Sequence, residues 1–344
     1  MTTSTPRTNA PDTSQVEAPA RTMRAIVQRT YGTADTWSLS EIDRPVIGAD
    51  QVRVRVHSAG LDRGTWHLMS GTPYAMRLGL GFHGPKTSVP GLDLSGTVVA
   101  VGTDVTRFQV GDEVFGIGKG AYAEYAAARE DKLALKPSTL PFHRAAALAV
   151  SGSTALRAVT DIGRVEAGQT VLVIGASGGV GSYAVQIATA LGAEVTGVCS
   201  AGKADLVRSL GAIHTLDYAR DDFADGRVKY DVIIDIAGNS SLSRLRRALA
   251  PRGTLVIVGG EDGENVTGGM GRQLRALAIS PFIRQRMALV LPKEHYTVLE
   301  RLAGLVQDGS LTPAVERTYP LAEAPTAMRH LVAGQVRGKL VISI

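Results

Sequence analysis

Hydrophobic and polar positions follow two different patterns along the chain, and the change falls near Pro141. Before it, residues 51–57 (QVRVRVH) alternate strictly between polar and apolar, which predicts a half-buried antiparallel strand. Four more short segments bounded by Gly, Pro and Asp have strand character: 24–28, 92–101, 113–116 and 121–128. Many short strands separated by turn residues predict a compact β-rich domain.

After residue 141, apolar runs of strand length alternate with segments of helical periodicity. We expect helices over 142–150 and 154–161 ahead of this alternation. The expected strands are 171–174, 194–198, 213–216, 231–236 and 254–258, and the helices among them include 181–191, 203–210 and 241–250. This order predicts a doubly wound parallel sheet with right-handed crossovers, so the fold class is α/β. Residues 339–344 return to β character, which indicates that the α/β domain is inserted into the β-rich one.

The stretch from Thr170 to Gly192 carries the clearest candidate chemistry. A buried apolar strand, 171–174, runs into the glycine-rich turn 176–181 (ASGGVG) and then into an amphipathic helix. Such a turn lets backbone N–H groups and the positive end of the helix approach a pyrophosphate. Ala176 stands where the first glycine of the usual fingerprint would be, and an ordinary strand–helix turn is the alternative. We expect a dinucleotide site that uses Ser177, Gly178, Gly179 and Val180.

The composition is that of an ordinary soluble globular protein, with 344 residues, 44% hydrophobic and 20% charged. The net charge of +5 is small and the basic residues are scattered, which argues against a nucleic-acid surface. One cysteine, Cys199, excludes an intramolecular disulfide and favours the cytoplasm. No apolar run reaches the ~20 residues of a membrane span. Residues 1–22 are interpreted as a disordered tail, with an organellar transit peptide as the alternative.

Five motifs together resemble the medium-chain dehydrogenase/reductase superfamily, in its zinc-independent quinone oxidoreductase-like branch. They are 52–66 (VRVRVHSAGLDRGTW), 89–102 (VPGLDLSGTVVAVG), 111–116 (GDEVFG), 176–181 (ASGGVG) and 337–342 (RGKLVI). The similarity covers residues 23–344. It implies a GroES-like substrate domain of residues 23–145 and 290–344 around a Rossmann domain of residues 146–289.

The resemblance also bears on metal binding. Zinc-bearing members have a cysteine and a Gly-His-Glu where this chain has Ala59–Asp62 and Gly91–Asp93. Their four-cysteine structural lobe is impossible with Cys199 alone, and the seven histidines show no paired spacing. Catalytic zinc normally needs three protein ligands. We expect no metal.

The end of the second Rossmann strand decides between NADH and NADPH. It lies at residues 198–200, where no acidic residue for the ribose hydroxyls precedes Asp205. Ser200 and Lys203 suit a 2′-phosphate, and the resemblance adds Tyr218 to the phosphate contacts. We expect NADPH. The alternatives are a solvated lysine and a packed tyrosine ring.

The remaining cofactor contacts follow from the same resemblance and from the rule that ligands bind at the carboxyl ends of parallel strands. Thr154 is expected near the nicotinamide half, unless its hydroxyl only bonds its own helix. The other expected contacts are Ala237, Gly238, Val258, Gly259 and Lys339.

Without a metal, hydride transfer relies on positioning and hydrogen-bond donors, which suits a quinone or an enone. Family members typically have Asn, Asp and Tyr along the loop after strand 51–57, where this chain has Asp62, Thr65 and His67. We interpret these three as the catalytic candidates, with His67 either a proton relay or a packed histidine. Trp66 and Tyr74 are the expected substrate-pocket walls, unless they are core aromatics.

Two other functions stay open: a metal-free carbonyl or enoyl reductase of a biosynthetic pathway, and a non-catalytic NADPH-binding sensor. The glycine-dense segment 259–271 is either a substrate lid or a surface loop. The resemblance implies a homodimer, and the apolar segment 277–290 is either its interface or an intradomain helix.

Overall fold

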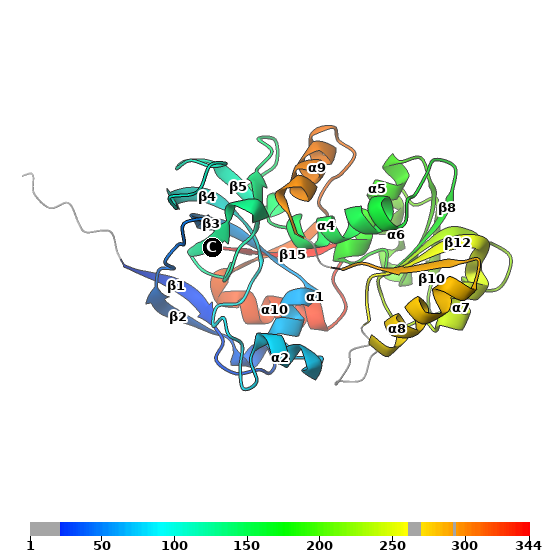
Figure 1. Cartoon of the computed structure of the whole chain (residues 1–344), viewed down its shortest axis with the longest axis horizontal. Coiled ribbons are helices and arrows are strands. Elements are labelled where there is room, and N and C mark those ends of the chain that lie inside the picture. The colour runs from blue at the N-terminus through cyan, green and yellow to red at the C-terminus, as the bar shows by residue number, and fades with distance from the viewer. Residues whose placement is uncertain (1–20, 261–269, 292–293) are drawn as a thin grey trace, which may run out of the picture.

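The computed structural model describes residues 21–260, 270–291 and 294–344. Most of the predicted tail and most of the glycine-dense segment 259–271 lie outside these residues. Thr22, the last residue assigned to the tail, already belongs to the first strand. Figure 1 shows a β-rich part on one side and a helix-covered parallel sheet on the other.

The β-rich part is built on a seven-stranded sheet with the order β14-β15-β3-β4-β5-β7, and β6 also pairs with β3. Its strands are β3 (Gln51–Leu61), β4 (Asp93–Val101), β5 (Glu113–Ile117), β6 (Tyr125–Arg129), β7 (Leu133–Leu135), β14 (Val315–Pro320) and β15 (Lys339–Ser343). A separate antiparallel pair joins β1 (Thr22–Val27) to β2 (Ser38–Asp43). The predicted alternation is confirmed, because Val52, Val54 and Val56 of β3 are buried.

The other part is a six-stranded, wholly parallel sheet with the order β10-β9-β8-β11-β12-β13, the Rossmann arrangement. Its strands are β8 (Thr170–Ile174), β9 (Glu194–Cys199), β10 (His214–Asp217), β11 (Tyr230–Asp235), β12 (Leu249–Ile257) and β13 (Arg286–Leu289). Its helices are α5 (Gly179–Ala190), α6 (Ala204–Ser209), α7 (Leu242–Ala248) and α8 (Met270–Ile279). The predicted fold class is confirmed, and β13 is an additional strand.

Three local expectations need correction. The strand expected at 121–128 begins only at Tyr125, and Ala121–Ala123 are buried core residues instead. The helix expected over 142–150 is only the short helix α3 (Phe142–Ala145), and the next helix, α4 (Ala149–Leu156), begins near its predicted end. The helix expected over 154–161 is confirmed by the second half of α4 and its continuation as a π-helix over Arg157–Ile162. The expected loop after β3 is mostly the helix α1 (Arg63–Ser70), which Asp62 caps.

Of the two helices near the end of the chain, one lies at the junction of the two parts and the other lies within the β-rich part (Figure 1). The helix α9 (Tyr296–Gln307) packs on α4 and β7, and α10 (Ala324–Val332) packs on α1 and β3. A short helix, α2 (Arg77–Leu80), follows α1 on the surface. Within the described ranges, no helix has the length and apolar character to cross a bilayer.

Candidate functional site

A cleft of about 640 Å³ separates the carboxyl ends of β8, β11 and β12 from α1 and the segment that leads into β15. The parallel-sheet part, which we call the nucleotide domain, and the helix α4 form one wall. They contribute Val150, Ser151, Thr154, Gly175, Ser177–Val180, Lys203, Ile236, Ala237, Val258–Gly260 and Gln273. The β-domain wall contributes Leu61–Gly64, His67, Pro73, Met76, Leu331, Gly334, Val336, Gly338 and Lys339. This is the crevice where open parallel sheets bind their ligands.

The glycine-rich turn has the geometry of an anion cradle. Gly175 has a φ of +87°, which favours glycine, so it makes the sharp exit from β8 that the sequence pattern assigned to position 176. A Cβ on Gly181 would lie 2.1 Å from the Gly175 carbonyl oxygen, so helix and strand pack this closely only with glycine there. The helix α5 starts after Gly178 with no side-chain cap. Its first N–H groups are therefore available to an anionic ligand.

Lys203 lies at the edge of the cleft beyond β9 and is already engaged. Its ammonium donates hydrogen bonds to the carbonyl oxygens of Gly334 (2.8 Å) and Val336 (2.9 Å), in the segment that leads into β15. Burial lowers the pKa of the Lys203 ammonium. Ser200 and Tyr218 are not part of the cleft lining, and Tyr218 is 68% exposed. Sequence reasoning did not anticipate that Lys203 joins the two domains.

The strand ends supply backbone and small side chains to the cleft. Ala237, Val258 and Gly259 line it, whereas the Gly238 N–H lies behind and donates to Asp235 Oδ1 at 3.1 Å. Thr154 also lines the cleft, but its hydroxyl donates to the Val150 carbonyl oxygen of its own helix at 2.8 Å. The structure therefore shows the hydroxyl bonded to its own helix, and contact of Thr154 with the nicotinamide stays a prediction.

A buried ion pair underlies the junction of the two walls. Lys339 Nζ lies 3.4 Å from Asp93 Oδ2 and donates to Ser151 Oγ at 3.1 Å. Asp93 Oδ1 accepts the Val150 N–H at the start of α4 at 2.8 Å. Burial raises the pKa of the Asp93 carboxyl to about 7, while Lys339 opposes the rise and the charge of Asp62 adds to it. Sequence reasoning missed Asp93 and Ser151, although a carboxylate between the apolar residues of 89–102 was a signal for such a pair.

Asp62 and His67 line the cleft from α1. Asp62 Oδ1 accepts the Thr65 N–H at 2.8 Å, and among the described residues its Oδ2 has no hydrogen-bond partner. His67 Nδ1 lies 2.8 Å from the Thr72 carbonyl oxygen, so Nδ1 carries the proton and neutral His67 has a lone pair on Nε2. Thr65 is completely buried and absent from the lining, so it does not reach a substrate there.

The expected aromatic walls are not where the sequence placed them. Trp66 packs against the β-domain core with Arg63 5.4 Å from its ring centre. Tyr74 is 46% exposed and stacks with Arg77 at 4.5 Å. Neither ring lines the cleft, because helical spacing in α1 directs His67 there instead of Trp66. The apolar surface comes from aliphatic residues and methionine: Leu61, Pro73, Met76, Val150, Val180, Ile236, Ala237, Val258, Leu331 and Val336.

Comparison with known proteins assigns the family. Residues 48–138 match the alcohol dehydrogenase GroES-like domain, and residues 210–342 match the family described as zinc-binding dehydrogenase. The chain is 32% identical over 340 residues to mouse quinone oxidoreductase, covering 93% of this chain and 97% of that protein. This chain belongs to the medium-chain dehydrogenase/reductase superfamily, in its quinone oxidoreductase-like branch.

Solved structures of this superfamily share the architecture. The quinone oxidoreductase of Coxiella burnetii aligns with a TM-score of 0.81 at 28% identity, over 94% of this chain and 99% of that one. A mycobacterial protein in complex with NADPH aligns with a TM-score of 0.79 at 27% identity, over 94% of this chain and 100% of that one. The chain is therefore an oxidoreductase of the family, which uses a nicotinamide cofactor.

The family includes zinc-binding dehydrogenases, so we compared the metal-ligating residues of the cleft with the ligand set that zinc requires. Asp62 and His67 are its one acid and one histidine among the described lining residues. Across the described ranges, no group of three or more His, Cys, Asp or Glu side chains is arranged to hold a metal ion. This donor set falls short of the three protein ligands that catalytic zinc normally requires.

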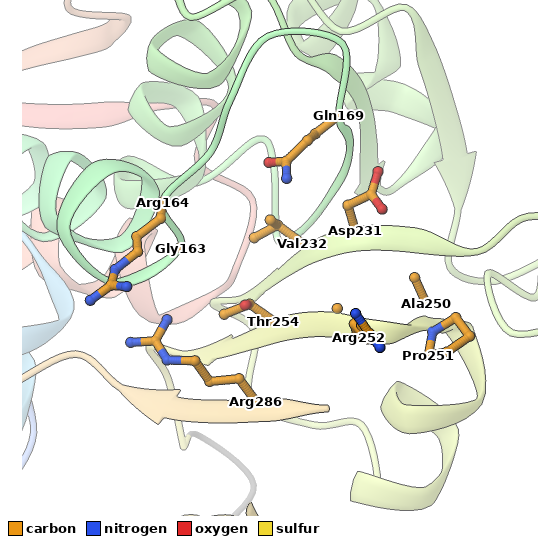
Figure 2. A pocket seen from close by; sticks show the side chains of 11 residues that line it. Gly163, Arg164, Gln169, Asp231, Val232, Ala250, Pro251, Arg252, Thr254 and Arg286 are labelled. Atoms are coloured by element: carbon orange, nitrogen blue, oxygen red, sulfur yellow. The ribbon is translucent and has the colours of Figure 1, made fainter. Parts of the chain in front are cut away.

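A second hollow, of about 530 Å³, lies at the opposite end of the parallel sheet (Figure 2). It is lined by the amino-terminal residues of β11 and β13, Asp231 and Arg286, and by Arg164, whose φ is +52°. Asp231 Oδ2 accepts the backbone N–H and the hydroxyl of Thr170, both at 3.0 Å. Because parallel sheets bind cofactors at the other end of their strands, this hollow is not the nicotinamide site.

Proposed function

We propose that this oxidoreductase transfers hydride from NADPH to a quinone or an α,β-unsaturated carbonyl without a metal. The observation that carries the choice of cofactor is Lys203 at the end of the second Rossmann strand. Of the described residues lining the cleft, the one acid is Asp62, which lies on the opposite wall. A ribose-binding acid is therefore missing where NAD-dependent Rossmann sites place it. The NADPH bound to the mycobacterial neighbour supports the same choice.

The residues present fit a dinucleotide. Gly178, Gly179 and Val180 would hold the pyrophosphate at the start of α5. Lys203 would bind the 2′-phosphate, with Ser200 and Tyr218 beside it. The ends of β11 and β12 would receive the nicotinamide. A Cβ on Gly259 would lie only 1.9 Å from the Ile236 carbonyl oxygen, so only glycine fits at that strand end. NADPH supplies the hydride when bound, and the protein positions it against the substrate.

The acceptor class follows from the donor set. A conjugated carbonyl accepts hydride at carbon while its oxygen gains negative charge, so a hydrogen-bond donor can replace a Lewis acid. His67 is the proton relay of this proposal, because it lines the cleft and the Thr72 carbonyl holds its Nδ1, which leaves Nε2 to exchange a proton. An ionised Asp62 only accepts hydrogen bonds and has no proton to donate. The aliphatic walls suit a flat, uncharged substrate.

The test is NADPH oxidation by chelator-treated protein against quinones, enones and simple aldehydes, with NADH in parallel. We expect turnover of quinones or enones with NADPH and much slower turnover with NADH. Activity only with saturated aldehydes or a thioester-linked enone would favour the biosynthetic reductase. Tight NADPH binding with no turnover would favour the sensor. Activity that chelation abolishes and zinc restores would contradict the metal-free mechanism.

A further inference from the structure

The proposed hydride transfer requires a donor at the substrate oxygen, and most polar groups of the cleft cannot provide one. Asp62 only accepts when ionised, and neutral His67 presents a lone pair because its Nδ1 proton is held by Thr72. The Thr154 hydroxyl donates to Val150. Lys203 and Lys339 are engaged in the contacts described above. The other side-chain donors of the described lining are Arg63, the hydroxyls of Ser151 and Ser177, and the amide of Gln273. Arg63 stacks on Trp66, Ser151 accepts a hydrogen bond from Lys339, and Ser177 lies on the turn that we expect to hold the pyrophosphate. Gln273 is next to Arg272, which bonds the strand ends that we expect to hold the nicotinamide.

Gln273 lies near the start of α8, which a partly buried arginine fixes to the strand ends. The Arg272 guanidinium pairs with Asp235, which is 0% exposed at the end of β11. The same group donates to the carbonyl oxygens of Ser240 (3.0 Å) and Gly259 (2.8 Å). Burial raises the pKa of the Asp235 carboxyl, and Arg272 opposes that rise. Arg272 thereby attaches the first turn of α8 to the strand ends that we expect to hold the nicotinamide.

The position of Gln273 follows from this attachment. Adjacent helical residues project about 100° apart, so Arg272 can turn toward the sheet while Gln273 turns to the cleft. Of the described α8 side chains, Gln273 is the one that lines the cleft. The described part of the chain provides no hydrogen-bond partner for its amide, so both N–H groups are available. Leu274 and Leu277 are exposed outside the lining.

We propose that the side-chain amide of Gln273 donates a hydrogen bond to the substrate's carbonyl oxygen and is a catalytic residue. This inference rests on the proposed function and deepens it. As the hydride forms a C–H bond at the conjugated carbon, the π electrons shift to the oxygen, and the Gln273 N–H stabilises that charge. A proton from solvent, relayed by His67, then neutralises the oxygen. The nicotinamide is oxidised and the quinone or enone is reduced by two electrons.

The first test compares Gln273→Leu with the control Leu274→Ala on the same helix. Removal of one donor to a developing oxyanion costs roughly 10²–10³-fold in kcat in an enclosed site, and we expect about 10–100-fold in this open cleft. The Kd for NADPH and the Tm should stay at wild-type values, and Leu274→Ala should be neutral. A Gln273→Leu enzyme with wild-type kcat/KM would overturn the inference. So would a loss of NADPH affinity that accounts for the loss of rate.

The second test uses Gln273→Glu, whose carboxyl donates when protonated and only accepts when ionised. A glutamate carboxyl has an ordinary pKa of about 4.3, so its protonated, donating fraction grows as the pH falls toward 5. The ratio of variant to wild-type kcat should therefore rise as the pH falls from 8 to 5. Any pH dependence that the two enzymes share cancels in the ratio. A ratio that does not change with pH contradicts a donor role.

A spectroscopic readout separates this inference from the proposed function. With NADP⁺ in place of NADPH no hydride is available, and the infrared carbonyl stretch of bound tetramethyl-1,4-benzoquinone reports its hydrogen bonding. We expect a lower frequency in the wild type than in Gln273→Leu. If the wild type reduces quinones, but Gln273→Leu has the same carbonyl frequency and the same rate as the wild type, only the Gln273 inference fails. If the wild type reduces no quinone or enone, the proposed function fails and Gln273 has no such role.

Discussion

Lys203 is a single residue with two competing sets of partners. In this structure it donates to two carbonyl oxygens of the β domain, whereas the proposed NADPH site gives it the 2′-phosphate. A charge-assisted hydrogen bond is worth about 1.5–3 kcal/mol, or roughly 10–150-fold in affinity. Lys203→Glu should weaken NADPH binding by at least this factor and NADH binding far less. Kd values from cofactor fluorescence measure both.

A matched control for Lys203 is Lys229→Glu. Lys229 is exposed and also donates to a backbone carbonyl, that of Arg247, but it is not part of the cleft lining. The Lys229→Glu variant should leave the Kd of NADPH and of NADH unchanged. If Lys203→Glu weakened NADH as much as NADPH, the residue would act by holding the domains together, and the phosphate contact would be wrong.

The Lys339–Asp93 pair makes a pH-dependent contribution to stability. The folded pKa of Asp93 is about 7, above its ordinary value of 3.8, so the folded protein holds this proton more tightly. The contribution of Asp93 to the free energy of unfolding therefore falls as the pH rises from about 4 to about 7. Lys339→Met removes the charge that opposes the rise, and breaking a buried pair costs about 3–5 kcal/mol.

We expect Lys339→Met to be most destabilising where Asp93 is ionised. Urea unfolding at pH 8.5 should show nearly the full loss, and unfolding at pH 5.5 a smaller one, because protonated Asp93 needs no counter-charge. In the double variant Asp93→Asn/Lys339→Met, the difference between the two pH values should largely disappear. An equal cost of Lys339→Met at both pH values would mean that the pair contributes packing without charge.

The attachment of α8 is a property of that element. Arg272→Met would leave Asp235 buried without its cation, while the three hydrogen bonds of Arg272 to the strand ends would be lost. We expect faster amide hydrogen exchange in α8 and unchanged exchange in α5, with a drop in kcat that follows from a displaced Gln273. Arg275→Met, an exposed position on the same helix, is the control. Protected α8 amides in Arg272→Met would contradict this role.

The elements that sequence patterns predicted best are those whose own residues report their burial. β3 was found from its alternating polar and apolar residues, and β8, β9 and β11 were found from short apolar runs that are buried on both faces. The helix α1 was missed because its motif resembles a family loop, although Asp62 at its N-cap and Gly71 at its C-cap were local signals. The four-residue β13 was missed within the apolar segment 277–290, since so short a run has no periodicity of its own.

The site was predictable where one local segment supplies it and was not where distant segments meet. The phosphate turn could be predicted from residues 176–181, because strand, glycines and helix are contiguous. The carbonyl partners of Lys203 lie 131 and 133 residues away, and the two charges of the Asp93–Lys339 pair lie 246 apart. Only the folded arrangement shows that both lysines connect the domains. Gln273 belongs to the same class, because its place in the cleft depends on Arg272 and on strand ends far along the chain.

At the scale of the whole molecule, the homodimer remains a prediction, and β13 offers the surface to test it. This edge strand pairs with β12 on one side, and the Val290 N–H points inward to the Ile257 carbonyl oxygen at 3.1 Å. Because strand N–H groups alternate, that of Leu289 points outward, where a second copy of the sheet could pair. Leu289→Pro removes this outward donor and leaves the inner ladder intact.

We expect light scattering to give twice 36.1 kDa for the wild type and a shift toward 36.1 kDa for Leu289→Pro with little change in Tm. Val290→Pro is the contrasting variant. It removes the hydrogen bond from Val290 to Ile257 within the sheet, so it should lower the Tm. Since α8 and β13 belong to one continuous segment, a dimer formed at this edge would also support the part of the fold that carries Gln273. Loss of the dimer should then reduce kcat as well as mass. A monomeric wild type would show that the sheet edge is free and that the cleft functions within one chain.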